Sequence, residues 1–391
     1  MRYLLFDDEN RANLLPLAYT RPIAEFRMGI LTIAEKWFRR MPNEVVFGGY
    51  VTETYLQGKY PLDMKEDQLW INASVCPNDA LIKDILSLEM NESLCDEQEH
   101  IIAFRSGNFD DSVDCQKSYT NVAFTRVQNL WDIFSKNAIE LEADFELITQ
   151  GRTSQKANST NNIIGEENLF IEDGAVLNCA IINASTGPVY IGKDAEVMEG
   201  SIIRGPFALC EASQTKLGAK IYGPTTVGPY SKVGGELNNV VIFGYSNKGH
   251  DGFLGNSVLG EWCNIGADSN NSNLKNNYAE VRLWNYATGR FAHTGLQFCG
   301  LIMGDHSKCG INTMFNTGTV VGVSANIFGT GFPRNFIPSF SWGGPQGQST
   351  FMIPKAFEVS EKVMARRNVV FDENDRKILT KVFDLSKDFR R

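Results

Sequence analysis

The sequence predicts two folded parts of different class, an α/β domain over residues 1–150 and a left-handed parallel β-helix over residues 163–345. Three observations predict this. The chain has 391 residues and 43.6 kDa, which is too long for one compact core. Only six of its 35 glycines precede residue 160, and the other 29 lie between Gly165 and Gly347. In that glycine-rich part, an aliphatic residue followed by glycine recurs every six residues.

The first 150 residues mix helical and strand patterns. Apolar residues recur at helical spacing over 30–40, and short apolar runs over 3–6 and 44–47 are typical of strands. This mixture indicates an α/β domain. Residues 151–162 are rich in serine and asparagine, and we interpret them as a linker.

The six-residue step then runs through most of the second part. It joins Val227-Gly228 to Val233-Gly234, Leu259-Gly260 to Ile265-Gly266, and Met303-Gly304 to Cys309-Gly310, Phe315-Asn316 and Val321-Gly322. Six is the period of hexapeptide solenoids, in which three short strands form each coil. We expect the aliphatic residue to fill the interior, small residues such as Ser307 to fit the bends, and glycine to adopt angles that other residues resist. A glycine-rich β-sandwich with chance spacing is the alternative.

Residues 346–391 return to a charged composition and are predicted to form helices, with Asp372 as an N-cap. The overall content is that of a globular protein, with 43% hydrophobic and 21% charged residues. The net charge of −9 argues against a nucleic-acid partner. No apolar run reaches the about 18–20 residues that cross a bilayer, and the first ten residues do not resemble a signal peptide. We therefore expect a cytoplasmic protein without a membrane partner.

The eight cysteines form no C-x-x-C pair, and with four histidines they predict no structural metal site. Chemistry-bearing residues instead gather between residues 248 and 273. Their order is Lys248-Gly249-His250, Phe253-Leu254-Gly255-Asn256, Asn264-Ile265-Gly266-Ala267 and Asn273. This segment resembles the acetyltransferase domain of the bifunctional uridylyltransferase/glucosamine-1-phosphate acetyltransferases and their archaeal sugar-1-phosphate relatives. Their pattern is K-x-x-H or K-x-H, an aromatic-L-G-D step, N-x-G-A-G and a further asparagine.

The resemblance implies transfer of an acyl group from acetyl-CoA, or another acyl-CoA, to an amino group. It assigns His250 as the general base, and Asn264 and Asn273 as catalytic positioning residues. The phosphate-binding lysine of the family falls near Asn238, so Lys248 or Lys232 is expected to bind substrate instead. It also implies a homotrimer with shared sites, for which the uncharged stretch 318–323 is a predicted face.

Further candidates lie in an insertion over residues 276–294. Its Arg290 and His293 are expected to reach over the site of a neighbouring subunit and bind substrate there. The alternative is that the exposed aromatic residues of such a hairpin only pack the hairpin against its own chain, which is more common. The alternative is that His250 is a histidine of a surface loop and has no catalytic role.

The first part has a fainter pattern in 15–22, Leu-Pro-Leu-Ala-Tyr-Thr-Arg-Pro, followed by Gly29 and Ile33. It resembles the R-P-L-T-x-x-x-P-K…G-K-P-I pattern of sugar-phosphate nucleotidyltransferases. The G-x-G-T-R loop of that family is replaced here by residues 7–11, Asp-Asp-Glu-Asn-Arg, and its lysine by Ile23. The resemblance therefore implies a nucleotidyltransferase-like domain that has drifted.

In this first domain Asp7 and Asp8 are candidates to hold Mg²⁺ on a nucleotide, and Arg11 and Arg21 to pair with phosphates. The competing interpretation, which we favour because the glycine loop is missing, is a capped turn over residues 7–10 with Arg21 paired to Glu25 four residues on. The favoured function is N-acyl transfer to an amino-sugar phosphate or nucleotide sugar. The alternatives are nucleotidyl transfer, which forms an NDP-sugar and pyrophosphate, and a catalytically inactive sugar- or nucleotide-binding protein.

Overall fold

The computed structural model describes residues 1–390, except for the side chains of two residues at 111 and 113, and its contacts divide the chain into two compact units. The N-terminal unit comprises Met1–Leu14, Thr20–Phe26 and Leu31–Asn129. The solenoid unit comprises Leu15–Tyr19, Arg27–Ile30 and the chain from Leu130 onward. The predicted domain boundary at 150 therefore differs from the contact boundary, which follows residue 129.

The N-terminal unit is built on a six-stranded sheet with the order β2-β1-β3-β5-β4-β6. Its strands are β1 (Arg2–Phe6), β2 (Val46–Val51), β3 (Gln68–Asn72), β4 (Glu92–Cys95), β5 (Ile101–Ser106) and β6 (Gln116–Tyr119). The two helices are α1 (Ile33–Arg40) and α2 (Asp79–Leu86), and short 3₁₀ turns are η1 (Glu9–Leu14), η3 (Ile23–Glu25) and η4 (Phe109–Val113). Strand β1 is parallel to both β2 and β3, so the carboxyl ends of all three strands meet at one edge of the sheet.

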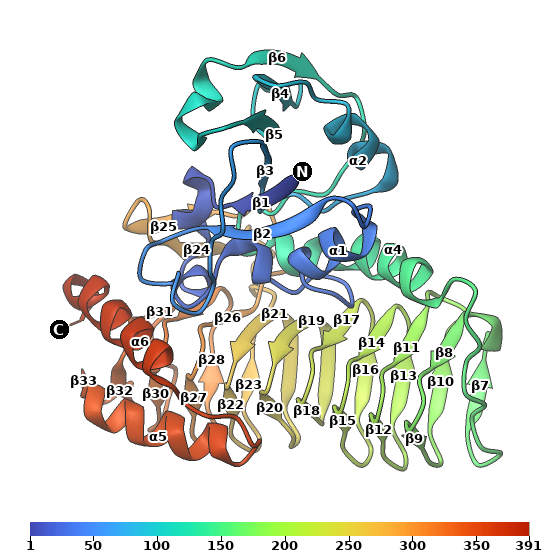
Figure 1. Ribbon diagram of the computed structural model, residues 1–391. Coiled ribbons are helices and arrows are strands. Elements are labelled where there is room, and N and C mark those ends of the chain that lie inside the picture. The colour runs from blue at the N-terminus through green and yellow to red at the C-terminus, as the bar shows by residue number, and fades with distance from the viewer. Residues whose placement is uncertain (391) are drawn as a thin grey trace. The chain divides into compact units, whose positions relative to one another are not determined.

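The solenoid unit is a stack of coils whose short strands pair in parallel with the strands of the next coil (Figure 1). One sheet contains β7 (Asn162–Ile164), β10 (Ile181–Asn183), β13 (Ile202–Arg204), β16 (Lys220–Tyr222), β19 (Glu236–Gly244), β21 (Phe253–Glu261), β26 (Leu301–Met303), β29 (Thr319–Val321) and β31 (Phe336–Ile337). The same sheet includes β8 (Leu169–Ile171), β11 (Val189–Ile191), β14 (Phe207–Leu209) and β17 (Thr225–Val227).

A second sheet forms another wall of the solenoid. It contains β9 (Val176–Leu177), β12 (Glu196–Val197), β15 (Gln214–Thr215), β18 (Lys232–Val233), β20 (Asn247–Lys248), β22 (Asn264–Ile265), β27 (Lys308–Cys309), β30 (Asn326–Ile327), β32 (Ser341–Gly344) and β33 (Gly347–Thr350). Strands β23 (Asn270–Asn271) and β28 (Met314–Phe315) pair separately, and β24 (Arg282–Asn285) and β25 (Arg290–His293) form an antiparallel hairpin within the predicted insertion.

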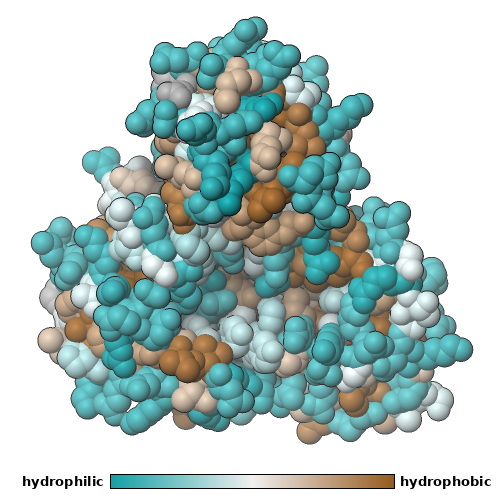
Figure 2. All heavy atoms as spheres, in the orientation of Figure 1, coloured by the Kyte–Doolittle hydropathy of each residue, from teal (hydrophilic) through white to brown (hydrophobic). Residues whose placement is uncertain are grey.

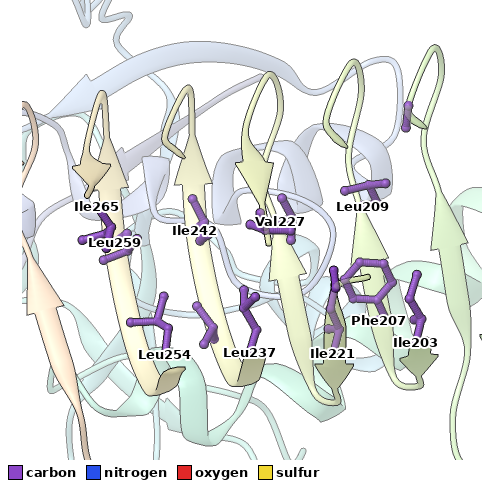
Figure 3. Close-up of a cluster of buried hydrophobic side chains, with 14 of the residues drawn as sticks. Ile203, Phe207, Leu209, Ile221, Val227, Leu237, Ile242, Leu254, Leu259 and Ile265 are labelled. Carbon is purple, nitrogen blue, oxygen red and sulfur yellow. The ribbon is translucent and has the colours of Figure 1, made fainter. Parts of the chain in front are cut away.

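The interior of the solenoid is filled by the aliphatic residues that lead each six-residue step. Val227, Val233, Ile265 and Val321 are all buried in one continuous hydrophobic core. In Figure 3 the side chains from successive coils lie in rows inside the walls. The small residue of the step is also buried, and the hydroxyl of Ser307 donates to the carbonyl of Gly322 in the next coil. The predicted interior of the six-residue repeat is therefore confirmed.

The glycines of the step are required for a different reason from the one we predicted. Gly228 and Gly266 do not have the positive φ angles that favour glycine. A Cβ atom at Gly228 would lie 2.0 Å from the carbonyl oxygen of Phe243, and one at Gly266 would lie 2.5 Å from Gly310. Positive φ occurs elsewhere, for example at Asp268 and His306. Glycine therefore allows the close approach of adjacent coils.

One wall of the solenoid is covered by other segments of its own unit. Helices α3 (Asp132–Ser135) and α4 (Asn137–Thr149) pack beside β17, β19 and β21. Asn137 accepts from the backbone N–H of Gly29 at 2.7 Å, and Thr226 donates to the Gly29 carbonyl at 2.8 Å. The stretch 318–323, predicted as a face for association, is buried within its own chain, where β29 packs against β24 of the insertion. That expectation was wrong because the sequence pattern does not reveal the covering segments.

The segment predicted as a linker is fastened to the first coils. Gln155 donates from its backbone N–H to Ile171 and from its side chain to Ala175, and Arg152 pairs with Glu172. At the other end, α5 (Ile353–Ala365), α6 (Glu373–Leu385) and η6 (Lys387–Phe389) form the predicted helical segment. Asp372 is the N-cap of α6, as predicted, because its carboxylate accepts from the N–H groups of Asn374 and Asp375.

The predicted fold class is confirmed: an α/β N-terminal unit is followed by a parallel β-helix with C-terminal helices. The viewed surface of the solenoid unit is largely hydrophilic, with scattered hydrophobic residues (Figure 2). Among residues 1–390, no helix combines the length and the apolar character needed to span a bilayer. All eight cysteines are free thiols, and all except Cys179 are buried.

Candidate functional site

A ladder of polar side chains runs along the outer face of the second sheet. Apart from β32 and β33, its strands are two residues long, and the two side chains of each such strand face opposite sides of the wall. The second residues, such as Val233 and Ile265, enter the core, whereas the first residues face outward. Parallel pairing places these outward residues in one line across five consecutive coils, in the order Gln214, Lys232, Asn247, Asn264 and Lys308.

Four residues of this ladder form the floor of a cavity of about 730 Å³; they are Lys232, Asn247, Asn264 and Lys308. The opposite wall comes from the end of α5, which contributes Val363, and from Arg366 and Arg367 just beyond it. Arg367 donates to the side-chain oxygen of Asn247 at 3.2 Å, which ties the helix end to the ladder. His250 and Asn264 both line the cavity and are exposed. The structure thus places two of the three predicted catalytic residues at one cavity.

The cavity is strongly cationic. Five of the described residues that line it are basic and none is acidic; the basic residues are Lys216, Lys232, Lys308, Arg366 and Arg367. Burial lowers the pKa of Lys232, and the positive charges of Arg367, Lys216 and Arg366 lower it further. Burial also lowers the pKa of Lys308 to about 8. Gathering like charges in this way is unfavourable without an anion, so the cavity is suited to phosphate or another polyanion.

A column of stacked aromatic rings borders the same cavity. Tyr245 and Trp262 line it, and their ring centroids are 4.3 Å apart at an interplanar angle of 18°. Tyr230 extends the stack on one side and His306 on the other. All four residues have positive φ, because each occupies the same corner of its coil. The corner geometry therefore presents a continuous aromatic strip beside the cations.

His250 lies in a loop that is fastened from inside the solenoid. Lys248 occupies the interior position of β20, in line with Val233, and is 1% exposed. Its ammonium donates to the carbonyl oxygens of His250 at 2.7 Å and Gly234 at 2.9 Å. Burial lowers the pKa of Lys248 to about 8. Lys248, which we predicted as a substrate-binding residue, thus points away from the cavity, whereas Lys232 faces it.

The remaining predicted residues of the second part lie outside this cavity. Asn273 donates to the side chain of Asn256 at 2.8 Å at another corner of the solenoid. Arg290 and His293 are exposed on the β24–β25 hairpin, and His293 Nδ1 lies 2.9 Å from the Glu280 carboxylate. This contact lowers the pKa of Glu280.

In the N-terminal unit, Asp7 and Asp8 follow β1 at the carboxyl edge of the parallel strands. Asp7 accepts from Arg11 at 3.0 Å, from Thr52 at 2.5 Å and from the backbone N–H of Ile23 at 2.8 Å. Burial raises the pKa of Asp7, and the Arg11 guanidinium opposes this rise. Asp7 and Arg11, two of the predicted nucleotide-binding residues, therefore bind each other in the structure.

Asp8 forms a second buried pair at the same edge. It accepts from Arg126 at 2.7 Å and from the side chain of Asn72 at 2.9 Å. Both charged side chains of the Asp8–Arg126 pair are less than 10% exposed. Arg21, the fourth predicted nucleotide-binding residue, is also buried. In the described part of the chain, no group of three or more His, Cys, Asp or Glu side chains could hold a metal ion.

Sequence reasoning missed most of the cationic wall. Lys308 could have been found, because it precedes a core residue of the six-residue repeat just as Lys232 and Asn264 do. Lys216 and Trp262 have no comparable signal. Arg366 and Arg367 could be placed only by their position at the end of a predicted helix, because the contact between α5 and the ladder is tertiary.

Comparison with known proteins agrees with the resemblance predicted from the sequence. Residues 3–153 match a family model described as sugar nucleotidyl transferase. The chain is also 27% identical over 171 residues to a bifunctional sugar-1-phosphate nucleotidylyltransferase/acetyltransferase of Sulfurisphaera tokodaii. That alignment spans 43% of this chain and 40% of the relative's length. The predicted resemblance to this bifunctional type of enzyme is confirmed.

Solved structures that a structural comparison matches to part of this chain include two UDP-N-acetylglucosamine acyltransferases. The enzyme of Francisella novicida is 10% identical with a TM-score of 0.27, over 58% of this chain and 87% of its own. The Arabidopsis enzyme is 15% identical with a TM-score of 0.25, over 55% of this chain and 80% of its own.

Proposed function

We propose that the chain is a transferase of sugar-phosphate or nucleotide-sugar metabolism. In this proposal its solenoid unit moves an acyl group from an acyl-CoA to the amino group of an amino-sugar phosphate. The observation that carries the proposal is the cavity in which His250 and Asn264 lie beside five basic and no acidic side chains. A general base, a neutral hydrogen-bond donor and a polyanion site are the three elements that this reaction requires.

The residues of the cavity fit both substrates. Acyl-CoA carries several phosphate groups and an aromatic base, and the cavity offers a group of cations beside the Tyr245–Trp262 stack. An amino-sugar phosphate adds one more anionic group. When bound, acyl-CoA supplies an activated thioester for transfer.

The side chains then have separate roles. The His250 imidazole takes the proton from the amino group as that nitrogen attacks. The amide N–H of Asn264 donates to the oxygen that becomes negative in the transition state. Lys232 and Lys308 orient the phosphates, and Lys248 holds the backbone of His250 from inside the solenoid. Asn273 takes no part in the proton transfer, because its amide is held by Asn256 outside the cavity.

A second candidate is nucleotidyl transfer by the N-terminal unit, which is favoured by the family match over residues 3–153. The arrangement of Asp7 and Asp8 does not fit Mg²⁺. Every oxygen of the two carboxylates already accepts a hydrogen bond, and an arginine neutralises each of them. We therefore derive no metal-dependent step and rank this activity below acyl transfer.

The products of the two reactions separate these functions. The full chain would be incubated with acetyl-CoA and a panel of amino-sugar phosphates, while free thiol is followed. A parallel set would contain each common NTP, Mg²⁺ and sugar 1-phosphates, while pyrophosphate is followed. The proposal expects thiol release that depends on the amino sugar. Pyrophosphate release without thiol release would reverse the ranking, and ligand-induced thermal stabilisation without either product would indicate a binding protein.

A homotrimer remains part of this proposal, although its predicted face is buried. Sedimentation equilibrium at micromolar concentration should give about three times the chain mass of 43.6 kDa. A monomer would show that the cavity of one chain is sufficient.

A further inference from the structure

A second hollow lies at the C-terminal end of the solenoid and shares no lining residue with the His250 cavity. Its volume is about 580 Å³, within the usual range for small-molecule pockets. Three segments that are distant in sequence build it. They are the β24–β25 hairpin through Trp284, the last coils through residues 332–349, and the C-terminal residues 388–390. Because an insertion, the last coils and the C-terminal residues all line it, this hollow is a pocket and not a gap between two neighbouring coils.

One side of the hollow is aromatic and well ordered by its own contacts. The ring of Trp284 stacks on Phe336 with centroids 4.2 Å apart and an interplanar angle of 12°. Phe389 meets Trp284 and Phe336 edge to face. Phe332 also lines the hollow, yet 56% of it is exposed. The hollow thus combines a fixed aromatic wall with an exposed ring that has room to cover a ligand.

The rest of the lining is polar but nearly balanced in charge. Ser341, Gln348 and Ser349 offer neutral donors and acceptors, while Arg334 and Asp388 carry opposite charges. Arg390 already donates to the Phe383 carbonyl and to Ser386, so it is partly engaged. The His250 cavity, in contrast, has five basic residues and no acidic one. The two sites therefore select different chemistry.

We propose that this hollow binds a neutral pyranose sugar. Such a ring has a face of C–H groups that packs against aromatic rings, and a rim of hydroxyls that both donate and accept. The aromatic wall of Trp284, Phe336 and Phe389 matches the face, and Gln348, Ser349 and Asp388 match the rim. A multiply charged phosphate would gain little here, because Asp388 offsets one of the two arginines and Arg390 already donates within the chain. The proposal does not depend on acyl transfer at His250.

Saturation-transfer NMR with N-acetylglucosamine and glucose as probes tests this site on the full chain. We expect transfer to the ring protons of at least one sugar, with a dissociation constant of about 1 mM. Phe332→Ala and Gln348→Ala should each raise that constant about tenfold. Phe332 is exposed, so its removal leaves the fold intact. Phe298→Ala is the matched control, because Phe298 is similarly exposed and does not line the hollow.

His250→Ala should leave the sugar signal unchanged, since His250 lines the other cavity. Three results would overturn the proposal. The first is that no saturation transfer is seen to either sugar at a sugar concentration about ten times the expected dissociation constant. The second is equal affinity in wild type, Phe332→Ala and Gln348→Ala, which would place the sugar elsewhere. The third is binding of adenosine without binding of either sugar, which would assign the aromatic wall to a planar base.

Discussion

The ammonium of Lys248 donates a hydrogen bond to the carbonyl oxygen of His250 at 2.7 Å from inside the solenoid wall. Lys248 stands in a row of core positions between Val233 and Ile265, and both of these neighbours are apolar. A charge is tolerated there because two backbone carbonyls accept from it. The lysine therefore fixes the backbone of the proposed base without touching the ligand.

The first prediction concerns the pH dependence of stability at Lys248. Its pKa is about 8 in the folded chain and about 10.5 when unfolded. Between these values the unfolded chain binds more protons, so stability should rise with pH, by at most about 3 kcal/mol. Below pH 8 Lys248 is charged in the folded chain as well, so the full cost of burying the charge lowers the stability there. Lys248→Met removes this effect. The free energy of unfolding of wild type, relative to that of the variant, should therefore increase from pH 8 to pH 10.

Urea unfolding at pH 7, 8, 9 and 10 measures this difference. Lys220→Met serves as the control, because Lys220 is exposed on another wall. Its stability should follow wild type across the series. A constant difference between wild type and Lys248→Met at all four pH values would mean that Lys248 is not a buried cation.

The second prediction concerns the cations of the His250 cavity. Lys232→Gln and Lys216→Gln should each weaken binding of CoA about tenfold, because each removes a charge that faces the phosphates. Calorimetry with CoA at low and moderate salt measures this, and the wild-type affinity should fall more steeply with salt than that of either variant. Lys220→Gln should bind as wild type. A similar loss of CoA affinity in all three variants would contradict the prediction, because it would show that only the net charge of the protein matters.

The third prediction uses the titration of Lys308. Because its pKa is about 8, the cavity loses one positive charge as pH rises through that value. CoA binding should therefore weaken between pH 7 and pH 9. Lys308→Met should bind more weakly than wild type at pH 7 and show a flatter pH profile. An unchanged wild-type affinity over this range would exclude Lys308 from the anion site.

The fourth prediction concerns the N-terminal unit. Arg126→Met should lower the free energy of unfolding by about 3–5 kcal/mol, because it leaves the Asp8 carboxylate buried without its partner. Adding Asp8→Asn should recover part of that loss. Lys117→Met, which removes an exposed ion pair with Glu99, should change stability little. Denaturant titration compares the four proteins, and equal stability of Arg126→Met and Lys117→Met would contradict the buried pair.

The sequence allowed the repeat to be predicted better than the site. Spacing alone identified Val227, Ile265 and Val321 as interior residues, because a coil that closes after a fixed number of residues repeats its environment at that number. Sequence also selected His250 and Asn264, which the fold brings to one cavity. It could not place Lys248, since a lysine in a motif does not reveal which side of the wall it faces. Nor could it place Arg367, since its contact with Asn247 joins segments 120 residues apart.

The rate of acyl transfer by His250→Ala tests the central claim most directly. With acetyl-CoA and the best amino-sugar phosphate from the panel, the kcat of the variant should be about 10²–10⁴-fold lower than that of wild type, which is the usual contribution of a general base. Its affinity for CoA should change little, because the cations hold the phosphates. His100→Ala, a histidine variant in the other unit, should keep the wild-type rate. A wild-type kcat in His250→Ala, beside a measurable wild-type reaction, would contradict the account and remove His250 from the chemistry.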